Sequence, residues 1–329
     1  MRHGSARLTL SFALVAACLA VSAWLTPVTA RQGRAGEPVT RPVISEDVSP
    51  IEPIAPVALD GHRGQGFLRK PPGAGPFPAI ILIHGGMVIR PPDVLKEYVL
   101  AAPQPSRFLA AGYVVAAITY RSRDDDPQSK VSLDDSLAAT NLVRQLSYVD
   151  SKSLVIYGCS GGGDLALEIA ATTDLAAIAP EEPASVLFTG VFNRDIPKAG
   201  DRYVPLDSEP ISADPTRYYT RAFQQLTREK IGRIHTPILI VQGDQHFINR
   251  FNAQVFIPEL RAAGKTLEVI TYAGEPHCFG FRGSGPQTPR PAVALKVFEA
   301  AETFFRRHLS TKPTPLSPTL VTHVPLLPE

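Results

Sequence analysis

The sequence predicts an α/β fold with a doubly wound, mostly parallel sheet. Short apolar runs alternate with stretches of helical periodicity along residues 57–309. The runs are continuously apolar, which is typical of strands buried on both faces of a parallel sheet. Gly112 and Gly264 stand where a helix must end before the next strand. Pro78 and Pro237 open apolar runs, a position where a missing N–H is tolerated.

The expected elements follow in a regular order. We expect strands at 79–83, 113–118, 154–157, 175–179, 238–241 and 267–271. We expect helices at 106–111, 133–146, 162–172, 252–262 and 292–308. A Pro-rich segment, 183–236, interrupts the alternation and holds one helical piece, 216–231. Because ligands bind at the carboxyl ends of such strands, an insertion between two late strands predicts a small lid there.

The first thirty residues predict a secretory signal peptide. Arg2 and Arg7 precede an uncharged apolar run, and small residues end at Ala30. An uncleaved membrane anchor and lipidation of Cys18 are the alternatives. The chain is therefore expected to be exported, to the periplasm or outside the cell, and to meet a membrane only through this segment.

Composition and charge limit the rest of the molecule. Apolar residues make up 44% of the chain and charged residues 19%, as in ordinary globular proteins. Without residues 1–30, the acidic and basic residues are equal in number, which argues against nucleic acid as a partner. Residues 31–56 and 310–329 are rich in proline, so we expect a linker and a disordered tail around the domain at 57–309.

The sharpest motif is G-x-S-x-G, with its serine at Ser160, between an apolar run and a helical stretch. A strand that turns into a helix within a few residues projects a strained nucleophile outward, and Gly158, Gly161 and Gly162 give it room. Cys159 is excluded as the nucleophile of this motif because Tyr157 occupies the position of its first glycine. The plainer interpretation is a Gly-rich turn with an N-capping serine.

A second motif, His84-Gly85-Gly86-Met87, follows the first expected strand. It fits a loop that donates backbone N–H groups to a developing oxyanion, so we expect the N–H of Gly86 or Met87 to act together with that of Gly161. His84 itself is interpreted as a packed loop histidine. The base that a serine nucleophile needs is expected at His277, on the loop after the last strand.

The order Ser160, acid, His277 resembles the α/β-hydrolase superfamily. With G-x-S-x-G-G at the elbow, the chain is most similar to the prolyl oligopeptidase catalytic domain and to dienelactone hydrolases, over residues 57–309. The resemblance implies a Ser–His–acid hydrolase that acts through an acyl-enzyme without metal or cofactor. The chain is too short to include the β-propeller of the large peptidases of this family. It also has His84 where those peptidases usually place a tyrosine that donates to the oxyanion. Small esters or short peptides are therefore the expected substrates.

The acid of the expected triad is ambiguous. The family usually places it three residues after the glycine that ends the preceding strand, and here that residue is His246. Asp244 is the first candidate. The alternatives are Glu181 and Glu182, which follow the strand at 175–179, where some members of the superfamily carry the acid. A misplaced acid also admits a different class of protein, a binding protein that kept the fold without efficient catalysis.

Three further features remain open at this stage. Cys159 and Cys278 are either buried thiols or, in an oxidising compartment, a disulfide. Asp244, His246, His277 and His84 are of types that bind zinc, but they show no metal-binding spacing, so no metal is expected. Three lid tyrosines could line a pocket: Tyr203, Tyr218 and Tyr219.

Overall fold

The computed structural model describes residues 39–86, 89–121, 130–191, 211, 214–281 and 291–326. The chain divides into two units, Met1–Glu37 and Pro38–Glu329, and every described residue belongs to the second. The expected signal peptide thus lies outside the described residues. Within them, no helix is long and apolar enough to cross a membrane.

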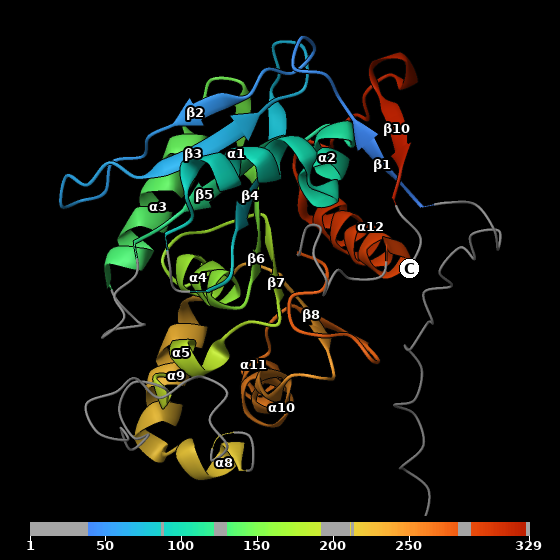
Figure 1. Cartoon of the computed structure of the whole chain (residues 1–329). Helices are drawn as coiled ribbons and strands as arrows, with labels where there is room; N and C mark the ends of the chain where they lie inside the picture. The colour runs from blue at the N-terminus through green and yellow to red at the C-terminus, as the bar shows by residue number, and fades with distance from the viewer. Residues whose placement is uncertain are drawn as a thin grey trace, which may run out of the picture. The chain divides into compact units, whose positions relative to one another are not determined.

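An eight-stranded sheet forms the centre, in the order β2-β3-β5-β4-β6-β7-β8-β9 (Figure 1). The last six are mutually parallel, whereas β3 is antiparallel to its two neighbours. The strands are β2 (Glu52–Ile54), β3 (Gln65–Arg69), β4 (Phe77–Ile83), β5 (Val114–Thr119), β6 (Val149–Cys159), β7 (Ala177–Glu181), β8 (Ile238–Gly243) and β9 (Leu267–Tyr272). The predicted α/β fold class and its six predicted strands are confirmed.

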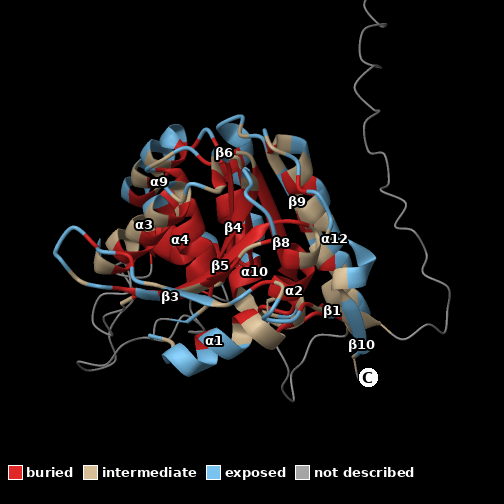
Figure 2. Ribbon diagram, turned by 90° about the horizontal axis from the view of Figure 1, so that it is seen from above, coloured by how far each residue is buried: buried red, intermediate tan, exposed pale blue. Residues whose placement is uncertain are grey.

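Helices cover both faces of the sheet. One face carries α3 (Lys130–Arg144), α4 (Gly161–Ala170), α9 (Arg221–Arg233) and α11 (Ile257–Ala262). The other carries α1 (Pro92–Ala101), α2 (Pro103–Ala110) and α12 (Pro291–His308). Along β4, Ile81 and Ile83 enter the first core, while Ile80 and Leu82 enter the second. Burial on both sides explains why central strands such as β4, β5 and β8 read as continuous apolar runs, and these strands are red in Figure 2.

The segment after β8 departs from the single expected helix. It forms α10 (Phe247–Phe251), one π-helical turn (Asn252–Phe256) and then α11. A π-turn widens the helix by one residue and is common near functional sites. Asn249, just before this turn, and Asn252, its first residue, reach the segment that follows β7.

The insertion between β7 and β8 is described only in part. It contains α5 (Ser185–Phe188), α8 (Pro215–Tyr218) and α9, and residues 192–210 and 212–213 lie outside the described part. Ile231 and Ile234 of this insertion pack into the core beside α4. The described portion therefore extends the helical layer, and α5 and α8 also pack near α10, which follows the carboxyl end of β8. The lid stays a prediction.

The expectation of a linker and a disordered tail is wrong for the described parts of 31–56 and 310–329. β1 (Thr40–Val43) pairs antiparallel with β10 (Thr322–Pro325). The paired residues Val43 and Thr322 are 279 positions apart in the chain. Leu316 N donates to the carbonyl of Ala110 at 2.8 Å. Backbone hydrogen bonds to distant partners hold these segments, and a proline-rich composition gives no sign of such partners.

Buried Arg69 fixes the N-terminal segment in the same way. Its guanidinium donates to the carbonyl oxygens of Ile44, Ser45 and Ser49 at 2.7, 3.1 and 2.8 Å. A buried guanidinium needs acceptors for its donors, and here the supposed linker supplies them. The edge strand β2 and its neighbour β3 were not predicted either, because both are short, partly exposed and have no apolar run.

Candidate active site

Ser160 occupies a sharp turn between β6 and α4. Its φ of 54° and ψ of −116° are unusual for a residue other than glycine, as expected for a strained nucleophile. A Cβ on Gly158 would approach the carbonyl oxygen of Gly162 to 2.2 Å, and one on Gly162 would approach that of Ile83 to 2.2 Å. Glycine is therefore needed at both positions for the strand to turn so tightly. The carbonyl oxygen of Ser160 accepts from Asp164 N and Ala184 N, both at 2.9 Å.

His277 lies on the loop after β9 and faces a buried carboxylate. Its Nδ1 lies 2.8 Å from Oε2 of Glu182, whose side chain is fully buried. The two atoms are not aligned as a hydrogen bond, and Nδ1 has no hydrogen-bond partner in the described part of the chain. A carboxylate at this distance holds the imidazole ring in one orientation and favours the tautomer with its proton on Nδ1.

Four donors surround the Glu182 carboxylate. Oε1 accepts from Gly243 N at 2.8 Å and from Asn249 Nδ2 at 2.7 Å. Oε2 accepts from Cys278 N at 2.5 Å and faces His277. Burial by itself would raise the pKa of Glu182, but the interactions with His277, Asn249 and Cys278 outweigh it and lower the pKa. The carboxylate is thus held in its ionised form.

The structure corrects the first choice of acid, Asp244. This residue is exposed, and its Oδ1 accepts from Gly274 N at 2.8 Å and Gln245 Nε2 at 2.6 Å. β8 ends at Gly243, so Asp244 enters the following turn rather than approaching His277. The position that usually carries the acid, His246, instead stacks on the His277 ring with centroids 4.1 Å apart. The alternative residue Glu182 takes the place beside the imidazole.

Glu181, the other alternative, binds elsewhere. Its Oε2 accepts from Tyr157 Oη at 2.9 Å, and its Oε1 accepts from Gly280 N at 2.5 Å. Burial, and then the charge of Glu182, raise its pKa to about 8. The two adjacent glutamates thus bind the loop that carries His277 at two points, Cys278 N and Gly280 N. At neutral pH Glu182 is ionised and Glu181 is largely protonated.

The His84–Gly86 loop lies beside the elbow, since a Cβ on Gly85 would lie 3.2 Å from Ser160 Cβ. His84 stacks on Tyr120 with centroids 4.7 Å apart, and its Nε2 lies 3.0 Å from Thr119 Oγ1. Burial lowers the pKa of His84 to about 4, so the ring is neutral and has a packing role. Tyr120 Oη donates to the carbonyl oxygen of Gly86 at 2.5 Å and thereby fixes the loop. Met87, the other expected donor, lies outside the described residues.

Two supporting residues were not found by sequence reasoning. Tyr120 follows a buried strand and Asn249 lies in a short helix, and neither belongs to a motif. Their roles depend on contacts across 34 and 67 positions of the chain, with Gly86 and Glu182 respectively. A single sequence carries no signal for contacts of this kind.

A disulfide joins Cys159 to Cys278, with Cα atoms 5.7 Å apart. Of the two alternatives left open, the structure has the bridge. Together with His277, these cysteines form the one group of three possible metal ligands found among the described residues, with ligand atoms within 4.8 Å of one another. Because a metal binds thiolates, the bonded sulfurs do not fit a metal centre.

Ser160 and His277 line the same cavity of about 430 Å³. Its walls are mostly apolar, and Arg90 contributes a cationic group. The remaining lining residues are Leu82, His84, Gly85, Gly86, Val94, Leu95, Tyr98, Ala117, Cys159, Cys278 and Phe281. The described lid tyrosines, Tyr218 and Tyr219, are not among them and instead pack against a cluster with α10, while Tyr203 lies outside the described residues.

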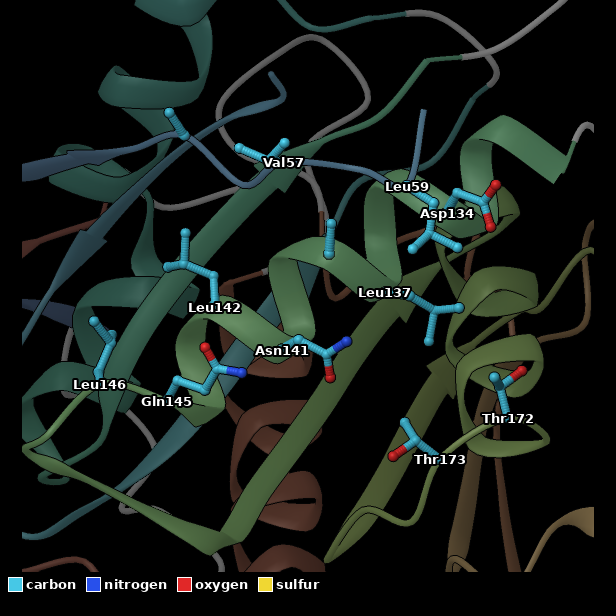
Figure 3. A pocket seen from close by; sticks show the side chains of 12 residues that line it. Val57, Leu59, Asp134, Leu137, Asn141, Leu142, Gln145, Leu146, Thr172 and Thr173 are labelled. Atoms are coloured by element: carbon cyan, nitrogen blue, oxygen red, sulfur yellow. The ribbon is translucent and has the colours of Figure 1, made fainter. Parts of the chain in front are cut away.

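A second cavity, of about 660 Å³, lies away from this site (Figure 3). Val57 and Leu59 lie on one side of it, α3 runs along it, and Thr172 and Thr173 lie beyond. It contains neither Ser160 nor His277. The first cavity is therefore the candidate active site.

Comparison with known proteins agrees with this architecture. The model of the prolyl oligopeptidase family matches residues 104–311, more than half of the chain. Esterase Est22 is similar in structure, with a TM-score of 0.56, 16% identity and coverage of 80% of this chain and 83% of that one. An esterase from the archeon Pyrobaculum calidifontis has a TM-score of 0.55, 17% identity and coverage of 78% and 85%.

A thermostable esterase from Pseudomonas putida ECU1011 has a TM-score of 0.54 and 19% identity, with 82% of this chain and 86% of that one covered. No curated protein sequence matches the chain. The sheet, the elbow and these structures together define an α/β-hydrolase. The chain belongs to the prolyl oligopeptidase family, and it is a serine hydrolase of the peptidase or esterase type.

Proposed function

We propose that the protein hydrolyses an acyl bond through Ser160, His277 and Glu182. The observation that carries this proposal is the buried Glu182 carboxylate 2.8 Å from His277 Nδ1, with Ser160 at a strained elbow on the same cavity. In this arrangement Ser160 is the nucleophile, His277 the general base and Glu182 the group that orients the imidazole.

The reaction would proceed in two half-reactions. Ser160 Oγ attacks the substrate carbonyl carbon while His277 Nε2 takes the hydroxyl proton. The backbone N–H of Gly161, at the start of α4, and that of Gly86 or Met87 stabilise the oxyanion. Collapse of the tetrahedral intermediate expels the leaving group, which takes the proton from His277. Water activated by His277 then attacks the acyl-enzyme, releases the acid and restores Ser160.

Small esters are the substrates that the cavity favours. Its volume of about 430 Å³ is at the small end for a ligand site, and its apolar walls suit a short acyl chain. The structural relatives named above are esterases. Short peptides are the second substrate class, because the family model is that of prolyl oligopeptidases.

Export from the cell is part of the proposal. Arg2 and Arg7, the following apolar run and the small residues ending at Ala30 motivate it. The Cys159–Cys278 disulfide supports it, because such bonds persist mainly in oxidising compartments. Mass analysis of the protein secreted by an expression host should give a mature N-terminus close to residue 31. An intact N-terminus, or a lipid on Cys18, would contradict simple export.

The alternative of a binding protein without catalysis was motivated by the misplaced acid. That motivation weakens because Glu182 occupies the required place beside His277. A fluorophosphonate probe separates the two functions, since it reacts with an activated serine. We expect labelling of the wild-type protein at Ser160 and none of Ser160→Ala.

The direct test of function compares two sets of substrates. We expect the wild-type protein to hydrolyse 4-nitrophenyl acetate and butyrate, with a burst of 4-nitrophenol if deacylation is slow, and Ser160→Ala to show no activity above background. Cleavage of aminoacyl 4-nitroanilides at a higher kcat/KM would move the substrate class to peptides. Failure of folded protein to cleave either set or to take the probe would contradict the proposal.

A further inference from the structure

The disulfide joins the residue before Ser160 to the residue after His277. Cys159 is the last residue of β6, and Cys278 lies on the loop after β9, 119 positions further along. Both cysteines are buried, at 1% and 7% exposure. β7 and β8 lie between β6 and β9 in the sheet, so the loop after β9 must return past their carboxyl ends to bring Cys278 to Cys159.

Other contacts fix the His277 loop mainly from one side. Cys278 N and Gly280 N donate to Glu182 and Glu181, and both of these acceptors belong to the segment at the end of β7. The disulfide is the one covalent link in the described residues between this loop and the segment that carries Ser160. It thus sets the distance between nucleophile and base directly.

The backbone at Cys278 also needs support. Its φ of 59° lies in the left-handed region, which is unfavourable for a residue other than glycine. Such a conformation persists only where the surroundings hold it. The bond to Cys159 and the hydrogen bond from Cys278 N to Glu182 are the contacts that do so.

We propose that this disulfide is a positioning link that keeps His277 within reach of Ser160, and that its reduction lowers activity. The inference depends on the proposed serine hydrolase function. Reduction adds two electrons and two protons, breaks the S–S bond and gives two thiols; with dithiothreitol as reductant, the reductant leaves as its cyclic disulfide.

The distance change explains the expected effect. Bonded sulfurs lie about 2.05 Å apart, whereas non-bonded atoms of this size pack at about 3.5 Å or more, so the sulfurs separate by about 1.5 Å on reduction and the His277 loop is free to shift. Misplacement of a catalytic group by about 1 Å costs up to about 100-fold in rate. We therefore expect kcat to fall about 10- to 100-fold, with a smaller change in KM.

The experiment uses the exported protein and 4-nitrophenyl butyrate. The protein is reduced with dithiothreitol until titration shows both thiols, freed of reductant and assayed; it is then reoxidised and assayed again. We expect loss of kcat with unchanged circular dichroism, and recovery on reoxidation. The control variant Cys159→Ser/Cys278→Ser should have the low activity of the reduced protein and should not respond to dithiothreitol.

Each other outcome is informative. Full activity of the doubly reduced protein would overturn the inference, and so would loss of activity together with loss of the folded circular dichroism signal, because the bond would then serve stability alone. If the double variant does not fold, reversible reduction of the wild-type protein still decides. Oxidised, folded protein without any hydrolase activity would instead contradict the proposed function.

A second inference concerns Arg90, the cationic side chain of the cavity. Its Nη2 donates to the carbonyl oxygen of Gly85 at 3.2 Å. No carboxylate pairs with it among the described residues, and no acidic side chain of the described chain lines the cavity. A half-buried guanidinium without an acidic partner keeps several donors free for a ligand.

We infer that the preferred substrate carries a carboxylate that pairs with Arg90, within the hydrolase function proposed above. A planar guanidinium binds a carboxylate through two parallel hydrogen bonds, and apolar walls strengthen such a pair by excluding water. The nucleophile and the cation of the cavity then bind different parts of the substrate. Ser160 meets the acyl carbon, and Arg90 meets the charged end.

The test compares the mono-4-nitrophenyl ester of adipic acid with 4-nitrophenyl hexanoate, which have the same chain length and leaving group. We expect about 10-fold higher kcat/KM for the adipate ester. Arg90→Gln should remove this preference, and Arg90→Lys should retain part of it. A wild-type preference for hexanoate, or an equal loss on both esters in Arg90→Gln, would overturn this inference. Lack of hydrolysis of both esters would instead contradict the proposed function.

Discussion

At the scale of single residues, two carboxylates at the ends of the neighbouring strands β7 and β8 have opposite environments. Glu182 is buried and accepts from Gly243, Asn249 and Cys278 besides facing His277. Asp244 is exposed and accepts from the neighbouring Gln245 and from Gly274 N, which lies on the turn after β9. A group that orients an imidazole must be fixed and shielded from water, and Glu182 alone of the two meets that requirement.

Replacing these acids by amides gives a matched pair of variants. Glu182→Gln should lower kcat/KM about 10²- to 10⁴-fold, because the amide neither stabilises the imidazolium nor enforces the same tautomer. Asp244→Asn should stay within about twofold of wild type, since an amide oxygen can still accept from Gly274. Steady-state hydrolysis of 4-nitrophenyl butyrate measures both. The reverse order of effects would restore Asp244 as the acid.

The pH dependence of stability is a second prediction at this scale. Burial raises the pKa of Glu181 to about 8 in the folded protein, against about 4.3 in an unfolded chain. The stability from this group is fully present below the unfolded value and is lost as pH rises toward about 8, because the unfolded state releases the proton first. Between pH 5 and pH 8.5, the Tm of Glu181→Gln should therefore fall less than the Tm of the wild-type protein.

Thermal unfolding at several pH values checks this prediction. The control is Glu97→Gln, which replaces an exposed glutamate on α1 and should follow the wild-type profile. An unchanged profile in Glu181→Gln would show that this carboxyl is ionised in the folded protein at neutral pH.

The sequence could identify some of these residues and not others. Ser160 and His277 stand in local patterns, a glycine-framed turn and a loop after the last strand, so neighbouring residues predict where they lie. The contact with Glu182 depends on how β7, β8 and the His277 loop meet at one edge of the sheet. In the sequence, Glu181, Glu182 and Asp244 all stand at or just after the end of a predicted strand. Which of them contacts His277 depends on the three-dimensional turn after Gly243.

At the scale of elements, burial on both faces made the parallel strands predictable. β4, β5, β7 and β8 are mostly apolar along their length, β6 is apolar in its second half, and the six expected runs fall within β4 to β9 or overlap them. β1, β2 and β10 were missed because they are short, partly exposed and contain proline, and β3 was missed because its five residues form no apolar run. Helix α1 was missed in the same region of weak periodicity, and proline at its first position starts it.

The C-terminal segment offers a test at this scale. Thr311 N donates to Ser153 Oγ at 2.7 Å, Leu316 N donates to Ala110 O at 2.8 Å, and Leu316 packs against the core of α2 and α12. Deletion of residues 310–329 should therefore lower stability by about 2–4 kcal/mol, at roughly 1 kcal/mol per lost hydrogen bond plus the lost packing.

Urea unfolding followed by circular dichroism measures this loss. Deletion of residues 327–329 alone is the control, and it should leave the unfolding midpoint where it is. Equal midpoints for the long deletion and the intact chain would mean that the segment from 310 onward contributes nothing to the fold.

At the scale of the whole molecule, the site is assembled from segments far apart in the chain. The oxyanion loop follows β4, Ser160 follows β6, Glu182 follows β7 and His277 follows β9. All these strands are parallel, so their carboxyl ends meet at one edge of the sheet, where ligands bind in folds of this kind. The disulfide then connects the second and the last of these segments.

This long connection should also stabilise the molecule. A cross-link between residues 119 positions apart restricts the unfolded chain, and such bonds contribute about 2–4 kcal/mol. We expect Cys159→Ser/Cys278→Ser to unfold at a correspondingly lower urea concentration while its native circular dichroism stays that of the wild type. Equal stability of the oxidised wild type and the double variant would contradict the stabilising role without affecting the positioning role.

The most direct measurement is a crystal structure of the protein after reaction with a fluorophosphonate. The account predicts phosphorus bonded to Ser160 Oγ, the phosphoryl oxygen facing the N–H of Gly161, and His277 between the adduct and Glu182. A folded protein that takes no label, a label on another residue, or a His277 ring paired with Asp244 in place of Glu182 would contradict it.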